Sequence, residues 1–146
     1  PAGHRPVAMA WSTDGAHVLA ALTNRTAVVW DTRTGKIAQT LRGHGDLILA
    51  VALSPDGQRA VTGSYDRTIR VWDLATGDSR VLRGHGASVD FVGWRRNGTQ
   101  LVSAGRDGTV RVWPAPPTTV SRAEFERKLD GATSAVLGAG DEPTTP

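Results

Sequence analysis

The chain has 146 residues, a formal net charge of +3 and no cysteine. This length accommodates one domain, and the absence of thiols excludes disulfides and the cysteine ligands of zinc or iron–sulfur sites. The sequence also lacks a phosphate-binding glycine loop and a secretory signal. We therefore expect no cofactor, no metal and a cytoplasmic location.

Residues 1–42 contain four short apolar stretches that turn residues separate. The turn Ser12-Thr-Asp-Gly15 follows the first stretch, and Thr34-Gly35 precedes the last. Glycine accepts the positive φ angles that tight turns require, and short apolar stretches between such turns are typical of β-strands. The predicted strands are 7–11, 17–22, 26–30 and 36–41.

Residues 43–83 repeat this arrangement, and residues 84–115 repeat it in part. The predicted strands are 48–53, 59–64, 68–72, 79–82, 89–94, 100–105 and 109–113. Pro114-Ala-Pro-Pro117 then ends the pattern, because proline removes hydrogen-bond donors from a sheet. We therefore expect the third repeat to lack a fourth strand. Many short strands at this spacing predict an all-β protein.

Residues 116–146 have a different composition, which begins with a Pro-rich linker. Ser121-Arg-Ala-Glu124 has the form of a capping box, and apolar residues follow it at helical spacing, namely Phe125, Leu129, Ala132 and Val136. These signals predict one short amphipathic helix over about 121–137. The helix either packs on the last repeat or binds a partner, and both alternatives remain open. The polar end, 140–146, is predicted to be disordered.

Two sequence markers recur with the strands. Gly-His begins at positions 3, 43 and 84, and tryptophan ends an alternating stretch at positions 30, 72 and 113, so equivalent residues lie 40 to 42 positions apart. A repeat of this length with these markers resembles the WD40-repeat family over residues 3 to 115. The resemblance implies a β-propeller of four-stranded antiparallel blades, here three of them, about 1–42, 43–83 and 84–115, although the third repeat shows no fourth strand of its own.

Three blades are too few to close a ring, because propellers generally have at least four. We therefore expect an incomplete ring that leaves two apolar blade faces exposed. One interpretation is that the chain is the C-terminal part of a longer multidomain protein with further blades upstream. Its arginine-rich and lysine-poor composition is typical of a GC-rich bacterium. Self-association, for example of two copies into a six-bladed ring, is the other way to cover the exposed faces.

The resemblance also implies a buried hydrogen-bond relay in each blade. In the second repeat it would join His44, Thr62, Asp66 and Trp72, and in the third it would join His85, Ser103, Asp107 and Trp113. The first repeat departs from this pattern, because Ala20 and Asn24 stand where the hydroxyl and the carboxylate would be. We therefore expect an incomplete relay around His4 and Trp30.

A histidine between a carboxylate and a hydroxyl also resembles a catalytic triad. A catalytic serine, however, needs an exposed hydroxyl beside an oxyanion hole, whereas these sets recur once per repeat beside a tryptophan that we expect to be buried. The structural interpretation is favoured, and the chain is predicted not to be an enzyme. The arginines alternate with apolar residues along the strands, as Arg70 and Arg111 do. This distribution disfavours nucleic-acid binding, and no membrane segment is predicted.

WD40 propellers are typically interaction platforms, so the resemblance implies a non-enzymatic scaffold for protein partners. The family geometry leaves certain positions exposed on one face of the ring, where we expect the partner to bind. They are Thr23, Leu47, Leu49, Tyr65, Ser88, Asp90 and Arg106. Tyr65 and Arg106 are the strongest candidates, because tyrosine and arginine are frequent at interface hot spots. The alternative is a regulatory propeller attached to a bacterial serine/threonine kinase or STAND-type NTPase, whose catalytic domain would lie upstream.

Overall fold

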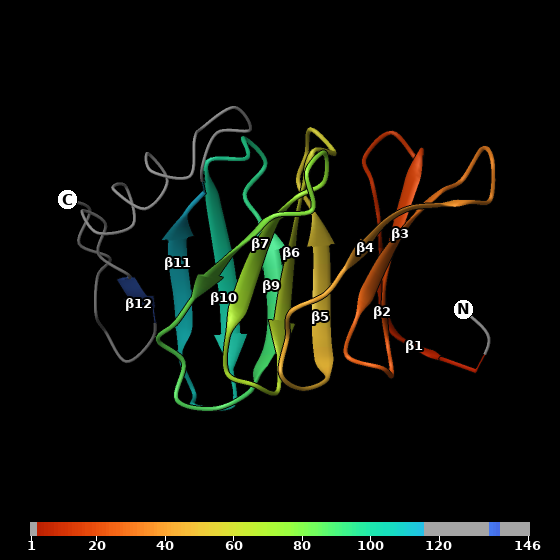
Figure 1. Ribbon diagram of the computed structural model, residues 1–146. Coiled ribbons are helices and arrows are strands. Elements are labelled where there is room, and N and C mark those ends of the chain that lie inside the picture. Colours follow the sequence, from red (N-terminus) through yellow and green to blue (C-terminus); the bar gives the residue numbers. More distant parts are fainter. Residues whose placement is uncertain (1–2, 116–134, 138–146) are drawn as a thin grey trace.

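The structure is a computed structural model that describes residues 3–115 and 135–137 (Figure 1). The described residues form three four-stranded antiparallel sheets and contain no helix. This architecture confirms the predicted all-β class and the three incomplete-ring blades. Nowhere in the described part of the chain does a helix have the length and apolar character needed to cross a membrane.

The twelve strands follow one another in chain order within each blade. Blade one contains β1 (Pro6–Trp11), β2 (His17–Leu22), β3 (Ala27–Asp31) and β4 (Ile37–Leu41). Blade two contains β5 (Ile48–Leu53), β6 (Arg59–Ser64), β7 (Ile69–Asp73) and β8 (Ser79–Leu82). Blade three contains β9 (Val89–Trp94), β10 (Gln100–Gly105), β11 (Val110–Pro114) and β12 (Ala135–Leu137).

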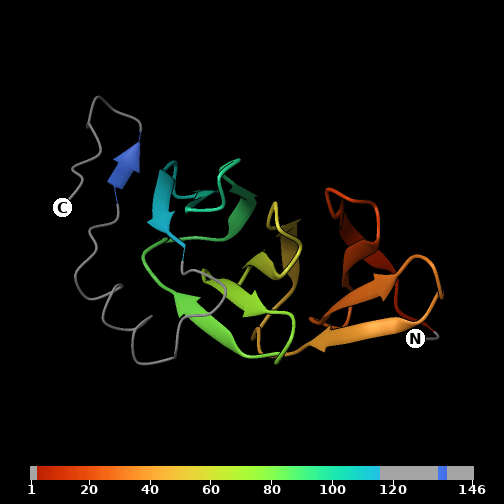
Figure 2. The same ribbon diagram turned by 90° about the horizontal axis from the view of Figure 1, so that it is seen from above.

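The three blades stand side by side in an open arc (Figure 2). The first strand of each blade lies along the inner side, so that β5 contacts both β1 and β9. The two principal hydrophobic clusters lie between neighbouring blades. One joins Leu19 and Leu41 of blade one to Trp72 of blade two, and the other joins Val61 of blade two to Trp113 of blade three. Burial between blades therefore orders the arc.

Apolar side chains are exposed at both ends of the arc. On β1, Val7, Met9 and Trp11 are 44%, 59% and 65% exposed, and they share one face because side chains alternate along a strand. On β9, Phe91 is 54% exposed. The corresponding inner strand of blade two, β5, has neighbours on both sides and exposes no large apolar residue to this degree. The exposed faces therefore result from the missing neighbours.

The fourth strand of blade three corrects two predictions. Residues 135–137, which the sequence predicts as the end of a helix, form β12, and β12 pairs antiparallel with β11, as Val110 with Leu137 and Val112 with Ala135. The third repeat therefore does have a fourth strand. The outer edge of β11 offers unpaired backbone N–H and C=O groups, which attract a strand from a distant segment. The predicted linker, the remainder of the predicted helix and the polar end lie outside the described residues.

Candidate functional site

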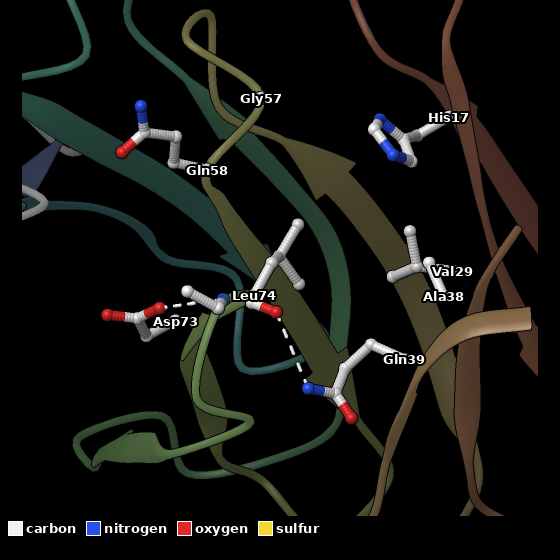
Figure 3. A pocket seen from close by; sticks show the side chains of 9 residues that line it. His17, Val29, Ala38, Gln39, Gly57, Gln58, Asp73 and Leu74 are labelled. Carbon is white, nitrogen blue, oxygen red and sulfur yellow. Dashed lines mark hydrogen bonds between the residues drawn. The ribbon is translucent and has the colours of Figure 1, made fainter. Parts of the chain in front are cut away.

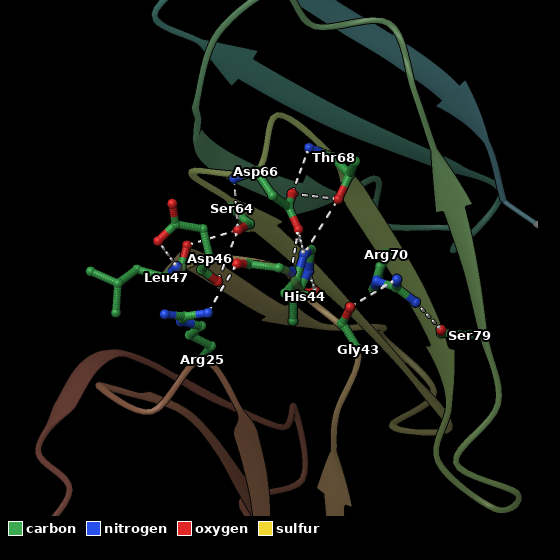
Figure 4. A network of polar contacts seen from close by, with 12 residues as sticks. Arg25, Gly43, His44, Asp46, Leu47, Ser64, Asp66, Thr68, Arg70 and Ser79 are labelled. Atoms are coloured by element: carbon green, nitrogen blue, oxygen red, sulfur yellow. Dashed lines mark hydrogen bonds and ion pairs between the residues drawn. The ribbon is translucent and has the colours of Figure 1, made fainter.

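In blade two, four side chains from two loops and two strands meet in a chain of hydrogen bonds. His44 lies in the loop before β5, Thr62 in the middle of β6, Asp66 in the loop after β6 and Trp72 on β7. The His44 Nδ1 atom lies 2.8 Å from Asp66 Oδ2, and its Nε2 atom lies 2.7 Å from Thr62 Oγ1. The Trp72 Nε1–H donates to the same Thr62 oxygen at 2.9 Å. Figure 4 shows the His44 and Asp66 end of this relay.

Blade three contains the same arrangement with serine in place of threonine. The His85 Nδ1 atom lies 2.9 Å from Asp107 Oδ2, and its Nε2 atom lies 2.8 Å from Ser103 Oγ. The Trp113 Nε1–H donates to Ser103 Oγ at 2.8 Å. The structure thus brings together both sets of four residues that the repeat spacing singles out.

The hydrogen-bond order bears on the protonation of His44. Trp72 has only a donor, so the Thr62 oxygen accepts from the indole, and the Thr62 hydroxyl proton is available for His44 Nε2. The Nδ1–H of the same ring then donates to the Asp66 carboxylate. A protonated ring would point a second N–H at the Thr62 oxygen and leave the hydroxyl proton without this acceptor. The relay therefore favours a neutral histidine, and burial likewise lowers the pKa of His44.

The carboxylate of each relay is held in its charged form. Burial raises the pKa of Asp66, but hydrogen bonds from Thr68, His44 and the Gly45 N–H outweigh burial and lower the pKa to about 2. For Asp107, burial is again opposed by hydrogen bonds, here from Thr109 and the Gly86 N–H, and the pKa is lowered. Both carboxylates therefore remain charged at neutral pH.

Sequence reasoning missed the threonine that completes each relay. Thr68 and Thr109 donate through both backbone N–H and hydroxyl to Asp66 and Asp107, and the two N–H distances are 2.8 Å and 3.0 Å. The sequence did contain a signal for these threonines, because the Asp-x-Thr spacing is identical in the loops of blades two and three. The missed residues tie each loop to the strand that follows it.

Sequence reasoning also treated Arg70 as one arginine in an alternating strand. Its guanidinium donates to the Gly43 carbonyl oxygen at 3.0 Å and to Ser79 Oγ at 2.9 Å (Figure 4). It also lies over the Trp72 ring, 5.9 Å from the centroid. Arg70 therefore fastens the loop that carries His44 to the outer strand of its own blade.

Blade one has no such relay. Ala20 offers no hydroxyl to Trp30, and His4 is exposed rather than buried against the strands. Asn24 instead accepts hydrogen bonds from its own turn, from the Thr26 N–H at 3.2 Å and from the Thr26 hydroxyl at 2.6 Å. The turn of blade one is therefore closed locally and is not connected to a tryptophan.

The relays do not have the access that catalysis requires. The hydroxyl-bearing residues Thr62 and Ser103 are 0% and 1% exposed, so no substrate can reach their oxygens. A nucleophilic hydroxyl must approach both a substrate and an oxyanion hole. Within residues 3–115, no three His, Asp or Glu side chains are grouped as metal ligands. The arrangement can order loops, but it cannot act as a triad.

Exposed side chains gather beside the relays, on the loops at the same end of the strands. The Arg106 Nε–H donates to Asp90 Oδ2 at 2.9 Å, and the Arg106 guanidinium lies over the Tyr65 ring, 5.5 Å from its centroid. Tyr65 belongs to blade two, whereas Asp90 and Arg106 belong to blade three. The three predicted residues therefore form one surface across a blade junction, and Tyr65 is 40% exposed.

The other predicted surface residues lie elsewhere or are less accessible. Thr23 is exposed in the equivalent loop of blade one, where its hydroxyl accepts from the Arg5 N–H at 3.2 Å. Leu47 and Leu49 are half-buried, and Ser88 is buried and holds Asp90 through a 3.1 Å hydrogen bond. Leu47, Leu49 and Ser88 therefore contribute less to the exposed surface than Tyr65, Asp90 and Arg106 do.

A comparison with protein families identifies the repeats. The family described as "WD domain, G-beta repeat" matches residues 2–31, 35–73 and 77–114. The first match covers β1 to β3, and each of the other two covers the fourth strand of one blade and the first three strands of the next, β4 to β7 and β8 to β11. A comparison with curated proteins gave no match.

Proposed function

Because the chain belongs to the WD40-repeat family, whose domains are generally non-catalytic platforms for protein interaction, we propose that it holds a protein partner on the surface formed by Tyr65, Asp90 and Arg106. The observation that carries this proposal is the stacked and hydrogen-bonded arrangement of these three exposed side chains. Arginine and tyrosine are enriched at interface hot spots.

The arrangement reduces the entropic cost of binding. Asp90 and Tyr65 both contact the Arg106 guanidinium and restrict its side chain, and the Ser88 hydroxyl donates to the Asp90 carboxylate. A side chain that is already ordered loses less rotamer freedom when a partner covers it. The relay beneath this surface orders the loops that bear Tyr65 and Arg106, because Asp66 and Asp107 are the next residues in each loop.

The test is to change Tyr65 and Arg106 to alanine in the full-length protein and to measure both partner capture from lysate and melting temperature. We expect each substitution to reduce capture of the specific partner at least about tenfold, as for a hot spot, with little change in melting temperature. Arg33→Ala is the matched control, since Arg33 is an exposed arginine at the opposite end of the strands. Unchanged capture by both variants would place the binding surface elsewhere.

The exposed faces of β1 and β9 support a further part of the proposal, that the three blades work within a larger assembly. That assembly is either a longer propeller in a multidomain protein or a ring completed by a second copy. A regulatory role beside a serine/threonine kinase or STAND-type NTPase domain is the alternative setting. The sequence that adjoins Pro1 in the parent protein distinguishes these settings.

A further inference from the structure

A crevice opens between blades one and two at the end of the strands opposite to Tyr65 (Figure 3). Its volume is about 300 Å³. The wall from blade one contains His17, Val29 and Gln39, and the wall from blade two contains Gly57, Gln58 and Leu74. In Figure 3, His17 stands on one side of the gap and Leu74 on the other, and the Gln39 Nε2–H donates across it to the Leu74 carbonyl oxygen at 3.4 Å. Apolar and polar side chains both line the crevice, and the Asp73 carboxylate is one of them.

At the equivalent junction between blades two and three, an arginine spans the gap between the blades. Arg59 lies at the start of β6 and is only 6% exposed. Its Nη2 group donates to the Gly98 carbonyl oxygen of blade three at 3.0 Å and lies 3.7 Å from Asp56 Oδ2. Its guanidinium also lies over the Trp94 ring, 4.6 Å from the centroid. The second junction thus shows how this fold holds a guanidinium between two blades.

The repeats place equivalent groups around the crevice between blades one and two. His17 is the first residue of β2, as Arg59 is of β6, and Gly57 ends the turn before β6, as Gly98 ends the turn before β10. Asp14 precedes His17 by three positions, as Asp56 precedes Arg59. The imidazole of His17 is too short to cross the junction as Arg59 does. The acceptors for a guanidinium are therefore present, but the guanidinium itself is not.

Asp14 is prepared to act as such an acceptor. Its Oδ1 atom accepts from Ser12 Oγ at 2.7 Å and from the Ala16 N–H at 2.9 Å, just as Asp56 Oδ1 accepts within its own turn. The hydrogen bond from Ala16 is the main cause of the lowered pKa of Asp14, so the carboxylate is charged at neutral pH. Within the described residues, Asp14 forms no ion pair with an arginine or lysine, whereas Asp56 pairs with Arg59. A second hollow is lined by Asp14, Asp56 and Gly57, and Gly57 lines the crevice as well.

We infer that the crevice between blades one and two binds the guanidinium group of an arginine side chain from a protein partner. The arginine would donate to the Gly57 carbonyl oxygen and to Asp14, as Arg59 donates to Gly98 and pairs with Asp56. Lysine fits less well, because its ammonium lacks the planar fork that reaches two acceptors at once. Leu53 stands at the position of Trp94, so the ring that Arg59 lies over has no counterpart here. This site is separate from the Tyr65 surface and adds a second point of attachment.

The test uses the full chain and N-acetyl-arginine-methylamide as the probe, with amide chemical shifts followed by NMR. We expect saturable shifts centred on Gly57 and His17, with a Kd in the millimolar range, and at least about tenfold weaker binding of the lysine analogue. An arginine inside a Gly-Ser peptide should bind at least as tightly as the capped amino acid. Tighter binding of free arginine than of this peptide would contradict a protein partner.

Two variants separate binding from folding. His17→Arg should place the chain's own guanidinium in the crevice and abolish probe binding, while the melting temperature stays equal or rises. Asp14→Asn keeps the Oδ1 acceptor of the turn and should weaken binding about tenfold. Asp46→Asn, at the other end of the strands, is the matched control and should bind as the natural chain does. Undiminished binding by His17→Arg, or no saturable shift in the natural chain, would overturn the inference.

Discussion

The relay of blade two connects a charged group at the surface to an indole in the core. Asp66 is partly accessible, with an 18% exposed side chain, whereas the His44 side chain is 0% exposed. The Thr62 oxygen is shared by Trp72 and His44, and the Asp66 carboxylate accepts from His44, Gly45 and Thr68. Removal of one member therefore leaves a buried polar group unpaired, which is the costly case.

The first prediction compares equivalent positions in two blades. His44→Ala and Asp66→Ala should each lower the free energy of unfolding by about 1–3 kcal/mol, because Thr62 or His44 loses a buried partner. Asn24→Ala should cost less than about 1 kcal/mol, because Asn24 closes only its own turn. Urea unfolding measures these differences. Equal losses at positions 24 and 66 would contradict the relay as the reason for the larger cost in blade two.

The second prediction concerns acid. The folded pKa of Asp66 is about 2, below the ordinary value of 3.8, so the unfolded chain takes up a proton first as the pH falls. The stabilisation is therefore complete above about pH 4 and should decline by roughly 2 kcal/mol as the pH approaches 2. The lowered pKa of His44 acts in the same direction, with a loss that begins below about pH 6.5. Urea unfolding at several pH values checks this, and Asp66→Asn should show a smaller decline below pH 4.

At the scale of single elements, the local sequence pattern was sufficient to predict where most strands lie. The predicted ranges 17–22, 59–64 and 100–105 are the observed β2, β6 and β10, because each apolar stretch lies between turns whose chemistry is local. β12 could not be found in this way. Its residues carry a helical spacing of apolar side chains, and the signal for a strand lies in the unpaired edge of β11, more than twenty positions away in the chain.

The relays were predictable for the same reason that the strands were, since their members recur at fixed positions in two repeats. The crevice between blades one and two was not. The crevice is present because position 17 holds histidine where the next blade has Arg59. This difference could be interpreted only once the structure showed that Arg59 crosses to Gly98 of the next blade. A comparison of equivalent positions across junctions supplies a signal that a single repeat lacks.

The third prediction concerns the turn after the second strand of each blade. Arg25 and Arg67 adopt positive φ angles of 69° and 72°, and Gly108 occupies the equivalent position with 78°. A side chain in this conformation costs about 1–2 kcal/mol, which glycine avoids at some cost in chain entropy. Arg67→Gly should therefore leave stability unchanged or raise it by up to about 1 kcal/mol.

Gly108→Arg is the reciprocal variant and should destabilise the chain by about 1 kcal/mol. Urea unfolding of both variants measures the two changes under the same conditions. A clear loss of stability in Arg67→Gly, beside a neutral Gly108→Arg, would mean that the Arg67 side chain makes a stabilising contact that offsets its backbone conformation.

At the scale of the whole molecule, the arc ends in two exposed apolar faces that carry different side chains. β1 presents Val7, Met9 and Trp11, and β9 presents Phe91. In the interior of the arc, β5 meets neighbours on both sides and its apolar side chains are covered from both directions. The repeats themselves therefore show that such a face is normally covered by another blade.

The fourth prediction is that the isolated chain self-associates, with the β1 face of one copy against the β9 face of another, or else is poorly stable. In a closed two-fold dimer this contact occurs twice. Sedimentation velocity should show a species larger than the monomer, and Met9→Glu with Trp11→Glu should shift it toward the monomer. Ile37→Glu, at an exposed apolar position on β4, is the control. A compact monomer with a cooperative melt would contradict this prediction.

The pairing of β12 with β11 also bears on the order in which the blades assemble. In blades one and two, five residues connect the third strand to the fourth, whereas twenty residues, 115–134, separate β11 from β12. A fourfold longer connection adds about 1.2 kcal/mol of loop-closure entropy to the docking of the last strand. We expect β12 to dock last during folding and to detach first during unfolding. When β12 detaches, the backbone N–H and C=O groups of β11 lose their partners. The outer edge of blade three is therefore where β12 of a second chain would pair with β11 in an exchange of strands.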